Sequence, residues 1–175
     1  MPIGILLVLI TAGLAIIKFS FRGEGIENSG IKVKQGAVLP EFSLVQLDGK
    51  EVPFSGIPGK VFLINFWATW CDACMQEMPS IVTLRESFKD QGFEVLGVNL
   101  DETPETAVPK VTQSLKMRFP IFKDPEGQVA DLFDVHAVPF TLIISKNRKV
   151  LMVHDGEKDW NSPEFRTQLK SWLTE

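Results

Sequence analysis

Both cysteines of the 175-residue chain, Cys71 and Cys74, lie in one C-x-x-C segment, and this segment stands where the sequence pattern changes. The residues before it, 61–68, are nearly continuously apolar, which is typical of a central strand covered on both faces. After it, apolar residues recur at steps of three and four with charged residues between them, which indicates an amphipathic helix that ends before Gly92. The sequence therefore predicts that both thiols lie at a strand-to-helix junction of an α/β domain.

The rest of the chain continues this alternation of strands and helices. We expect further strands at 42–47, 93–100, 119–122, 140–145 and 149–154, and helices within 104–117, 128–133 and 162–173. The last two strands are joined by a short turn at Asn147, so they must be antiparallel, and Ser162–Glu164 has the composition of a helix start. Trp67, Trp160 and Trp172 are expected in the core. The pattern predicts an α/β fold with a mixed central sheet and helices on both faces.

The charge balance excludes one class of partner. Beyond residue 23 the chain has 16 basic and 22 acidic residues, a net charge of −6, and no cluster of Lys and Arg. Because such a surface repels a phosphate backbone, we expect no nucleic acid as a partner. Two cysteines are also too few for a small domain that depends on several disulfides.

An uncharged apolar run, Ile3–Ile17, precedes the domain. As a helix it would cover roughly 22 Å, and snorkelling of Lys18 would bring it closer to the ~30 Å hydrocarbon core of a membrane. We interpret 1–22 as a transmembrane anchor or an uncleaved signal segment, since it lacks the basic start and the A-x-A site of a cleaved signal peptide. Residues 23–38 are interpreted as a linker and 39–175 as the folded domain.

The charges beside this run bear on its direction across a membrane. Lys18 and Arg22 follow the apolar residues, and no acidic residue occurs before residue 24. The positive-inside tendency would place these two charges, and the domain after them, in the cytoplasm. This observation counts against export of the domain.

The position of the two cysteines indicates how they would react. Cys71 at a helix N-cap would face unpaired backbone N–H groups and the positive end of the helix dipole, and both stabilise a thiolate. Cys74 follows within the first turn on nearly the same face, close enough for a disulfide. We therefore expect Cys71 to be the attacking nucleophile and Cys74 the resolving thiol. Asp72 opposes the thiolate and favours a reducing pair, or it only complements the helix dipole.

The segment Asn65–Pro79 resembles the active-site segment of the thioredoxin superfamily. It is most similar to the membrane-anchored TlpA/ResA/CcmG-like thiol-disulfide oxidoreductases, which have an AhpC/TSA-redoxin-like scaffold. Further segments stand in the family's order from about Leu39 to the end of the chain: 47–50, Gly59-Lys60, 124–127, Val138-Pro139 and 160–164. The resemblance implies a thioredoxin-like fold and an enzyme that reduces protein disulfides with its dithiol and without a further cofactor.

The resemblance also implies roles for residues near the dithiol. Val138 and Pro139 match the family's cis-proline loop, which faces the disulfide and helps to bind the partner's sulfur. Glu77 resembles an acid that is taken to assist proton transfer in the reducing branch, and the alternative is a solvated helix carboxylate. Asn65 occupies the position where thioredoxin itself has a buried acid. Trp70 is expected to shield the neighbouring sulfur and to offer a docking surface.

The same resemblance implies partners and a compartment. Its substrates would be disulfide-containing proteins such as the haem-attachment cysteines of c-type apocytochromes, and an integral membrane thiol carrier would reduce it again. The domain would be held by a single N-terminal anchor on the extracytoplasmic side of the membrane, in conflict with the charge argument from Lys18 and Arg22.

Two other functions remain open at this point. A peroxiredoxin-like peroxidase shares the scaffold, but its cysteine normally follows a Pro-x-x-x-Thr segment, whereas Thr69 stands two residues before Cys71 without such a proline. A membrane-tethered metal-binding or delivery module would use Cys71, Cys74 and His136, although three ligands at this spacing are a weak signature, and we expect no metal. Phe140 departs from the family, which usually has a small or hydroxylated residue there, and this departure could alter the partner groove.

Overall fold

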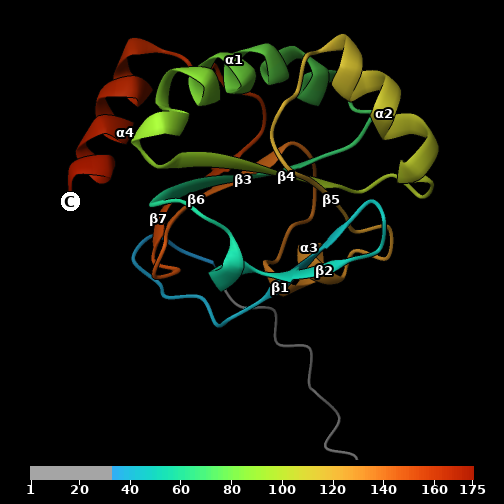
Figure 1. Cartoon of the computed structure of the whole chain (residues 1–175), viewed down its shortest axis with the longest axis horizontal. Coiled ribbons are helices and arrows are strands. Elements are labelled where there is room, and N and C mark those ends of the chain that lie inside the picture. The colour runs from blue at the N-terminus through green and yellow to red at the C-terminus, as the bar shows by residue number, and fades with distance from the viewer. Residues whose placement is uncertain (1–32) are drawn as a thin grey trace, which may run out of the picture.

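A seven-stranded sheet forms the centre of the fold in the computed structural model, which describes residues 33–175 (Figure 1). Its strands are β1 (Ser43–Gln46), β2 (Glu51–Pro53), β3 (Val61–Trp67), β4 (Phe93–Asn99), β5 (Ile121–Lys123), β6 (Phe140–Ser145) and β7 (Val150–Asp155). They lie in the order β2-β1-β5-β4-β3-β6-β7. β4 pairs in parallel with β3 and with β5, and the other pairs are antiparallel. The predicted mixed sheet and the antiparallel β6–β7 pair are confirmed.

Helices cover both faces of this sheet. Within the described residues they are α1 (Asp72–Phe88), α2 (Pro104–Ser114), α3 (Gln128–Leu132) and α4 (Pro163–Thr174), with short 3-10 turns η1 (Phe54–Gly56) and η2 (Lys89–Gln91). Figure 1 places α1, α2 and α4 over one face and α3 on the opposite face. The buried side chains agree, because α1, α2 and α4 contribute to one hydrophobic cluster and α3 to the other.

The central strand β3 is buried along its whole length. Leu63 and Trp67 belong to the cluster under α1, whereas Phe62 and Phe66 belong to the cluster on the other face. Because both faces are covered, every position of the strand is apolar or internally bonded, and polar residues do not alternate with apolar ones. Trp67 and Trp160 are fully buried and Trp172 packs against the same cluster, as expected.

Two strands differ from the expected ones. The sequence pattern does not predict β2, because its three residues are too few for an alternating pattern and only Val52 is partly buried. The strand forms because the turn at Asp48-Gly49 returns the chain along β1. The strand expected at 119–122 begins at Ile121 instead, since Pro120 has no N–H for a strand ladder.

The chain joins the fold slightly earlier than the expected domain start at Leu39. The Gly36 N–H donates to the Val150 carbonyl at 2.8 Å, and the Val150 N–H donates to the Ala37 carbonyl at 2.8 Å. Gly36 and Ala37, near the end of the expected linker (residues 23–38), therefore lie against the start of β7. The expected anchor, 1–22, lies outside the described residues. From Val33 onward, the structure contains no helix of the length and apolarity that a membrane span requires.

Candidate active site

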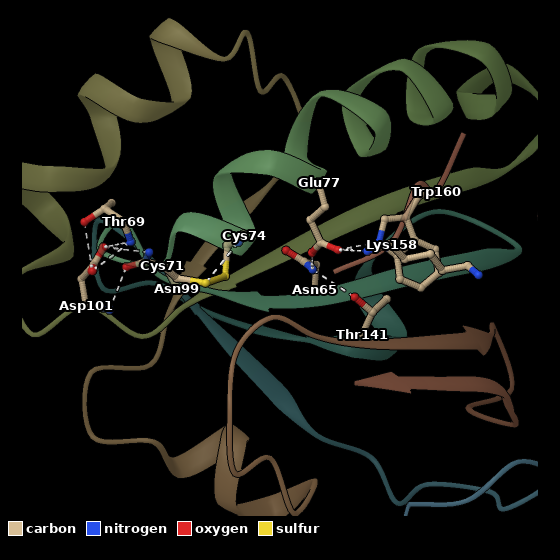
Figure 2. Close-up of a disulfide and its surroundings, with 10 residues drawn as sticks. All are labelled: Asn65, Thr69, Cys71, Cys74, Glu77, Asn99, Asp101, Thr141, Lys158 and Trp160. Carbon is tan, nitrogen blue, oxygen red and sulfur yellow. Dashed lines mark hydrogen bonds between the residues drawn. A yellow bond between two sulfur atoms is a disulfide. The ribbon is translucent and has the colours of Figure 1, made fainter. Parts of the chain in front are cut away.

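The two cysteines lie at the start of α1, directly after the carboxyl end of β3 (Figure 2). Cys71 is the N-cap of the helix and has an extended backbone. The Cys74 N–H donates to the Cys71 Sγ at 3.1 Å, so a sulfur atom occupies the place that a capping oxygen usually takes. Cys71 and Cys74 form a disulfide, with their Cα atoms 5.3 Å apart. The strand-to-helix placement that the sequence predicts is confirmed.

The two sulfurs differ in their access to solvent. Cys74 is fully buried, whereas Cys71 keeps 7% of its surface exposed. The neighbouring Trp70 side chain is 69% exposed, which is unusual for a tryptophan. An incoming partner would therefore meet Cys71 and Trp70 first, and Cys74 only behind them.

A buried carboxylate fixes the turn before Cys71. The Asp101 side chain accepts hydrogen bonds from the Thr69 N–H at 3.1 and 3.2 Å and from the Thr69 hydroxyl at 3.1 Å. It also accepts from the Asn99 side-chain amide at 2.9 Å. Asp101 and Asn99 follow or end β4, the parallel neighbour of β3, so both strands deliver their carboxyl ends to the same edge of the sheet. Sequence reasoning missed these two residues, although polar side chains at the end of a buried strand are a usable signal.

Glu77 points into the protein rather than into solvent, so the alternative of a solvated helix carboxylate is wrong. Its side chain is 2% exposed and accepts three hydrogen bonds. The Asn65 amide donates to Oε1 at 2.8 Å, and the Trp160 indole and the Lys158 backbone N–H donate to Oε2 at 2.9 and 3.2 Å. Burial raises the pKa of Glu77, and the three donors oppose this effect.

Asn65 connects Glu77 to the neighbouring strand. Its side-chain amide donates both to Glu77 and, at 3.0 Å, to the Thr141 hydroxyl on β6. Its Oδ1 atom is buried and has no hydrogen-bond partner. A neutral amide therefore occupies this position and supports the single buried acid beside it. Figure 2 shows the disulfide with the Asp101 cluster on one side and this Glu77 network on the other.

The loop with Val138 and Pro139 comes directly before β6. The bond between them is cis, and the Pro139 carbonyl accepts from the Gly156 N–H at 2.9 Å. Phe140 pairs with Phe66 near the end of β3, so the loop lies at the same sheet edge as the disulfide. The Phe140 ring is buried and packs against Phe66, with 6.0 Å between the ring centroids. Its size is therefore accommodated largely in the core.

The histidines do not join the cysteines. The His136 side chain is 82% exposed, and its Nε2 lies 3.1 Å from Asp134 Oδ1. His154, in β7, packs its ring against that of Trp160. Among residues 33–175 no group of three His, Cys, Asp or Glu side chains is arranged to hold a metal ion. The Thr69 hydroxyl, which a peroxidase reading would direct to the cysteine, donates to Asp101 instead.

Comparison with known proteins agrees with this site. Residues 35–153 match the AhpC/TSA family over most of the domain. The chain belongs to the AhpC/TSA family. It is 36% identical to the thiol-disulfide oxidoreductase ResA of Bacillus subtilis (strain 168) over 87% of this chain and 82% of that protein. It is 37% identical to the protein of the same name from Geobacillus kaustophilus (strain HTA426), over 89% and 86%.

A solved structure extends the comparison to the fold. The putative thiol:disulfide interchange protein DsbE from Chlorobium tepidum superposes with a TM-score of 0.72 and 31% identity, over 81% of this chain and 99% of that one. The fold of this AhpC/TSA family member is therefore thioredoxin-like. With its Cys71–Cys74 pair at the N-terminus of α1, the protein is a thiol-disulfide oxidoreductase of the ResA/DsbE type.

Proposed function

We propose that the protein is a membrane-anchored, extracytoplasmic reductase of protein disulfides. The observation that carries this proposal is the asymmetry of the Cys71–Cys74 pair. Cys71 caps α1 at the surface beside the exposed Trp70, and Cys74 is buried behind it. This difference in access supports attack on a large partner by Cys71, with Cys74 acting only afterwards.

The reaction follows from this asymmetry. In the reduced protein the Cys71 thiolate attacks one sulfur of the partner's disulfide, the partner's other sulfur leaves as a thiolate, and a mixed disulfide forms. Cys74 then attacks the Cys71 sulfur and releases the second partner thiol. Two electrons pass from the dithiol to the partner, and the Cys71–Cys74 disulfide remains. The free N–H groups at the start of α1 favour the Cys71 thiolate that begins the sequence.

Glu77 supplies a proton acceptor for the second step. Cys74 must lose its proton before it attacks, and it is shielded from solvent. Glu77 lies three residues further along α1, buried on the same side as Cys74. Because burial raises the pKa of Glu77, its carboxylate is a stronger base than an exposed one and can take up the proton of the Cys74 thiol.

The partner would dock over the exposed sulfur. Trp70 offers an apolar surface next to Cys71, and Val138, directly before the cis Pro139, stands at the same sheet edge, where its backbone would meet an extended segment of the partner. A partner with a disulfide in an extended, accessible segment fits this arrangement. The cysteine pair of an apocytochrome c before haem attachment is such a segment, and we propose it as the substrate.

The apolar run near the N-terminus supports the membrane anchor, and the substrate chemistry supports the compartment, against the charge argument from Lys18 and Arg22. The apolar run Ile3–Ile17 would hold the domain at a membrane, and the substrate class, a stable protein disulfide, persists only in oxidising extracytoplasmic spaces. An integral membrane thiol carrier would return electrons to Cys71 and Cys74 after each turnover.

A trapping experiment tests this function. Cys74→Ser in the full-length chain should stop the reaction at the mixed disulfide, so partners captured through Cys71 can be identified by mass spectrometry. We expect exported proteins with paired cysteines, apocytochromes c among them, and none with Cys71→Ser/Cys74→Ser. Protease added to spheroplasts should digest the domain. Capture of only cytoplasmic proteins, or a protected domain, would contradict the proposed compartment.

A further inference from the structure

Trp160 links a distant loop to the acid of the active site. It lies between β7 and α4 and is fully buried. Its indole N–H donates to Glu77 Oε2 at 2.9 Å, across 83 positions of sequence (Figure 2). The ring also packs edge-on against Phe165 of α4, with 5.0 Å between centroids. The indole is therefore held on its apolar side and directed at one carboxylate oxygen on its polar side.

The same loop holds Glu77 at two further points. The Lys158 backbone N–H donates to Oε2, the atom that Trp160 also contacts. The Trp160 backbone N–H donates to the Ser80 hydroxyl at 3.0 Å, and this hydroxyl donates to the Glu77 carbonyl at 2.7 Å. The loop thus contacts the side chain of Glu77 directly and its backbone through the Ser80 hydroxyl. Two of the three hydrogen bonds that the carboxylate accepts come from it.

We propose that Trp160 is a positioning residue for the thiol-disulfide reaction, whose indole N–H fixes the orientation and the proton affinity of the Glu77 carboxylate beside the dithiol. This inference rests on the proposed role of Glu77 in proton transfer. An indole N–H can only donate, so it stabilises the charged carboxylate more than the neutral carboxyl group, which is the weaker acceptor. Removal of this donor would leave the buried carboxyl with a stronger hold on its proton.

Other titratable groups lie around Glu77 and the Trp160 ring. Glu157 raises the pKa of Glu77 by repulsion, an effect smaller than that of burial. The Lys158 ammonium lies 5.8 Å from the centre of the Trp160 ring, and His154 packs on that ring at 5.5 Å. Among the groups that lower the pKa of Glu77, Trp160 contributes most, ahead of Asn65 and the Lys158 backbone.

The test is the pH dependence of disulfide reduction by Trp160→Phe. Measured as the rate at which Cys74 resolves a preformed mixed disulfide at Cys71, the wild-type activity should fall at low pH as Glu77 becomes protonated, and Glu77→Gln should lack this limb of the profile. Since a hydrogen bond to a charged group corresponds to about one to two pKa units, the limb should move up by about one to two pH units in Trp160→Phe. Trp172→Phe, which changes a tryptophan of the same core without a bond to Glu77, should leave the limb in place.

A measurement without substitution at Trp160 covers the case in which Trp160→Phe folds poorly. In the wild type the indole N–H resonance of Trp160 should titrate with the midpoint of the acid limb, and the titration should vanish in Glu77→Gln. An unmoved limb in Trp160→Phe, or an indole resonance that does not titrate, would overturn the inference while the role of Glu77 stands. If Glu77→Gln keeps the acid limb, the proton-transfer role in the proposed function fails instead.

Discussion

Glu77 is the residue whose surroundings differ most from those of an ordinary helix carboxylate. It is enclosed by Asn65, Trp160 and the Lys158 backbone, and its charge is compensated by hydrogen bonds and not by a cation. Such a group costs free energy when it is charged, because three neutral donors replace water only in part. An apolar side chain at this position would avoid this cost in free energy.

This cost predicts a pH-dependent effect on stability. The folded-state pKa of Glu77 is raised above its ordinary value of 4.5, so folding takes up a proton between these two values. The stability of the wild type relative to Glu77→Gln should therefore be highest at low pH and fall as the pH rises from about 4.5 through the folded-state pKa. Urea unfolding of both oxidised proteins across this range measures the difference. A difference that grows in favour of the wild type as the pH rises would contradict the account.

Asp72 allows a second prediction at the same scale. Its exposed carboxylate follows Cys71 in the first turn of α1, where it opposes a neighbouring thiolate. Asp72→Asn should stabilise the reduced form and raise the reduction potential by roughly 10–20 mV, as expected for one exposed charge. Redox equilibration with glutathione measures this value. Asp90→Asn, at the far end of the same helical segment, is the matched control and should leave the potential unchanged.

The active-site residues themselves can be predicted from the sequence, but their hydrogen-bond partners cannot. Cys71, Cys74 and Glu77 lie close together at the start of α1, so local spacing and family resemblance identify them. The hydrogen bonds from Lys158 and Trp160 to Glu77 span 81 and 83 positions, and no local pattern encodes them. Trp160 is predictable as a core residue, but its polar function depends on tertiary structure.

Among the elements, the order and type of the long strands and helices are predictable from the sequence, whereas short strands and their exact starts are not. β3 and β4 have largely apolar runs and α1 has helical spacing, so their sequences alone identify them. β2 has three residues and depends on its pairing with β1. The start of β5 is decided by Pro120, which cannot donate to a neighbouring strand.

The start of α4 provides a test at this scale. Ser162 is the N-cap, and its hydroxyl accepts from the Phe165 N–H at 3.3 Å. The helix orients Phe165 against Trp160, so its start also bears on the loop that contacts Glu77. Ser162→Ala should lower the free energy of unfolding by about 0.5–2 kcal/mol. Ser171→Ala, near the other end of α4, should change it far less, and equal losses in urea unfolding would argue against the capping role.

In the whole molecule, the sheet brings the parts of the site to one edge. β3 leads into Cys71, β4 ends beside Asp101, and β6 begins just after Pro139. Three segments separated in sequence thus meet around one pair of sulfurs, and Glu77 of α1 lies behind them, bonded to the loop that precedes α4. The fold places the more accessible sulfur in front and the buried sulfur behind, an arrangement that suits the sequential disulfide exchange proposed above.

The most direct test of this arrangement is the adduct formed by each single-cysteine variant of the reduced protein with a peptide disulfide. Reduced Cys74→Ser should form a mixed disulfide at Cys71 rapidly, because Cys71 caps the N-terminus of α1, faces its N–H groups and is the more accessible sulfur. Reduced Cys71→Ser should form one at Cys74 at least about tenfold more slowly, since its sulfur is buried. The wild type should release the peptide as a dithiol and end with the Cys71–Cys74 disulfide. Equal adduct rates at the two cysteines, or faster reaction at Cys74, would contradict the assignment of Cys71 as the attacking thiol.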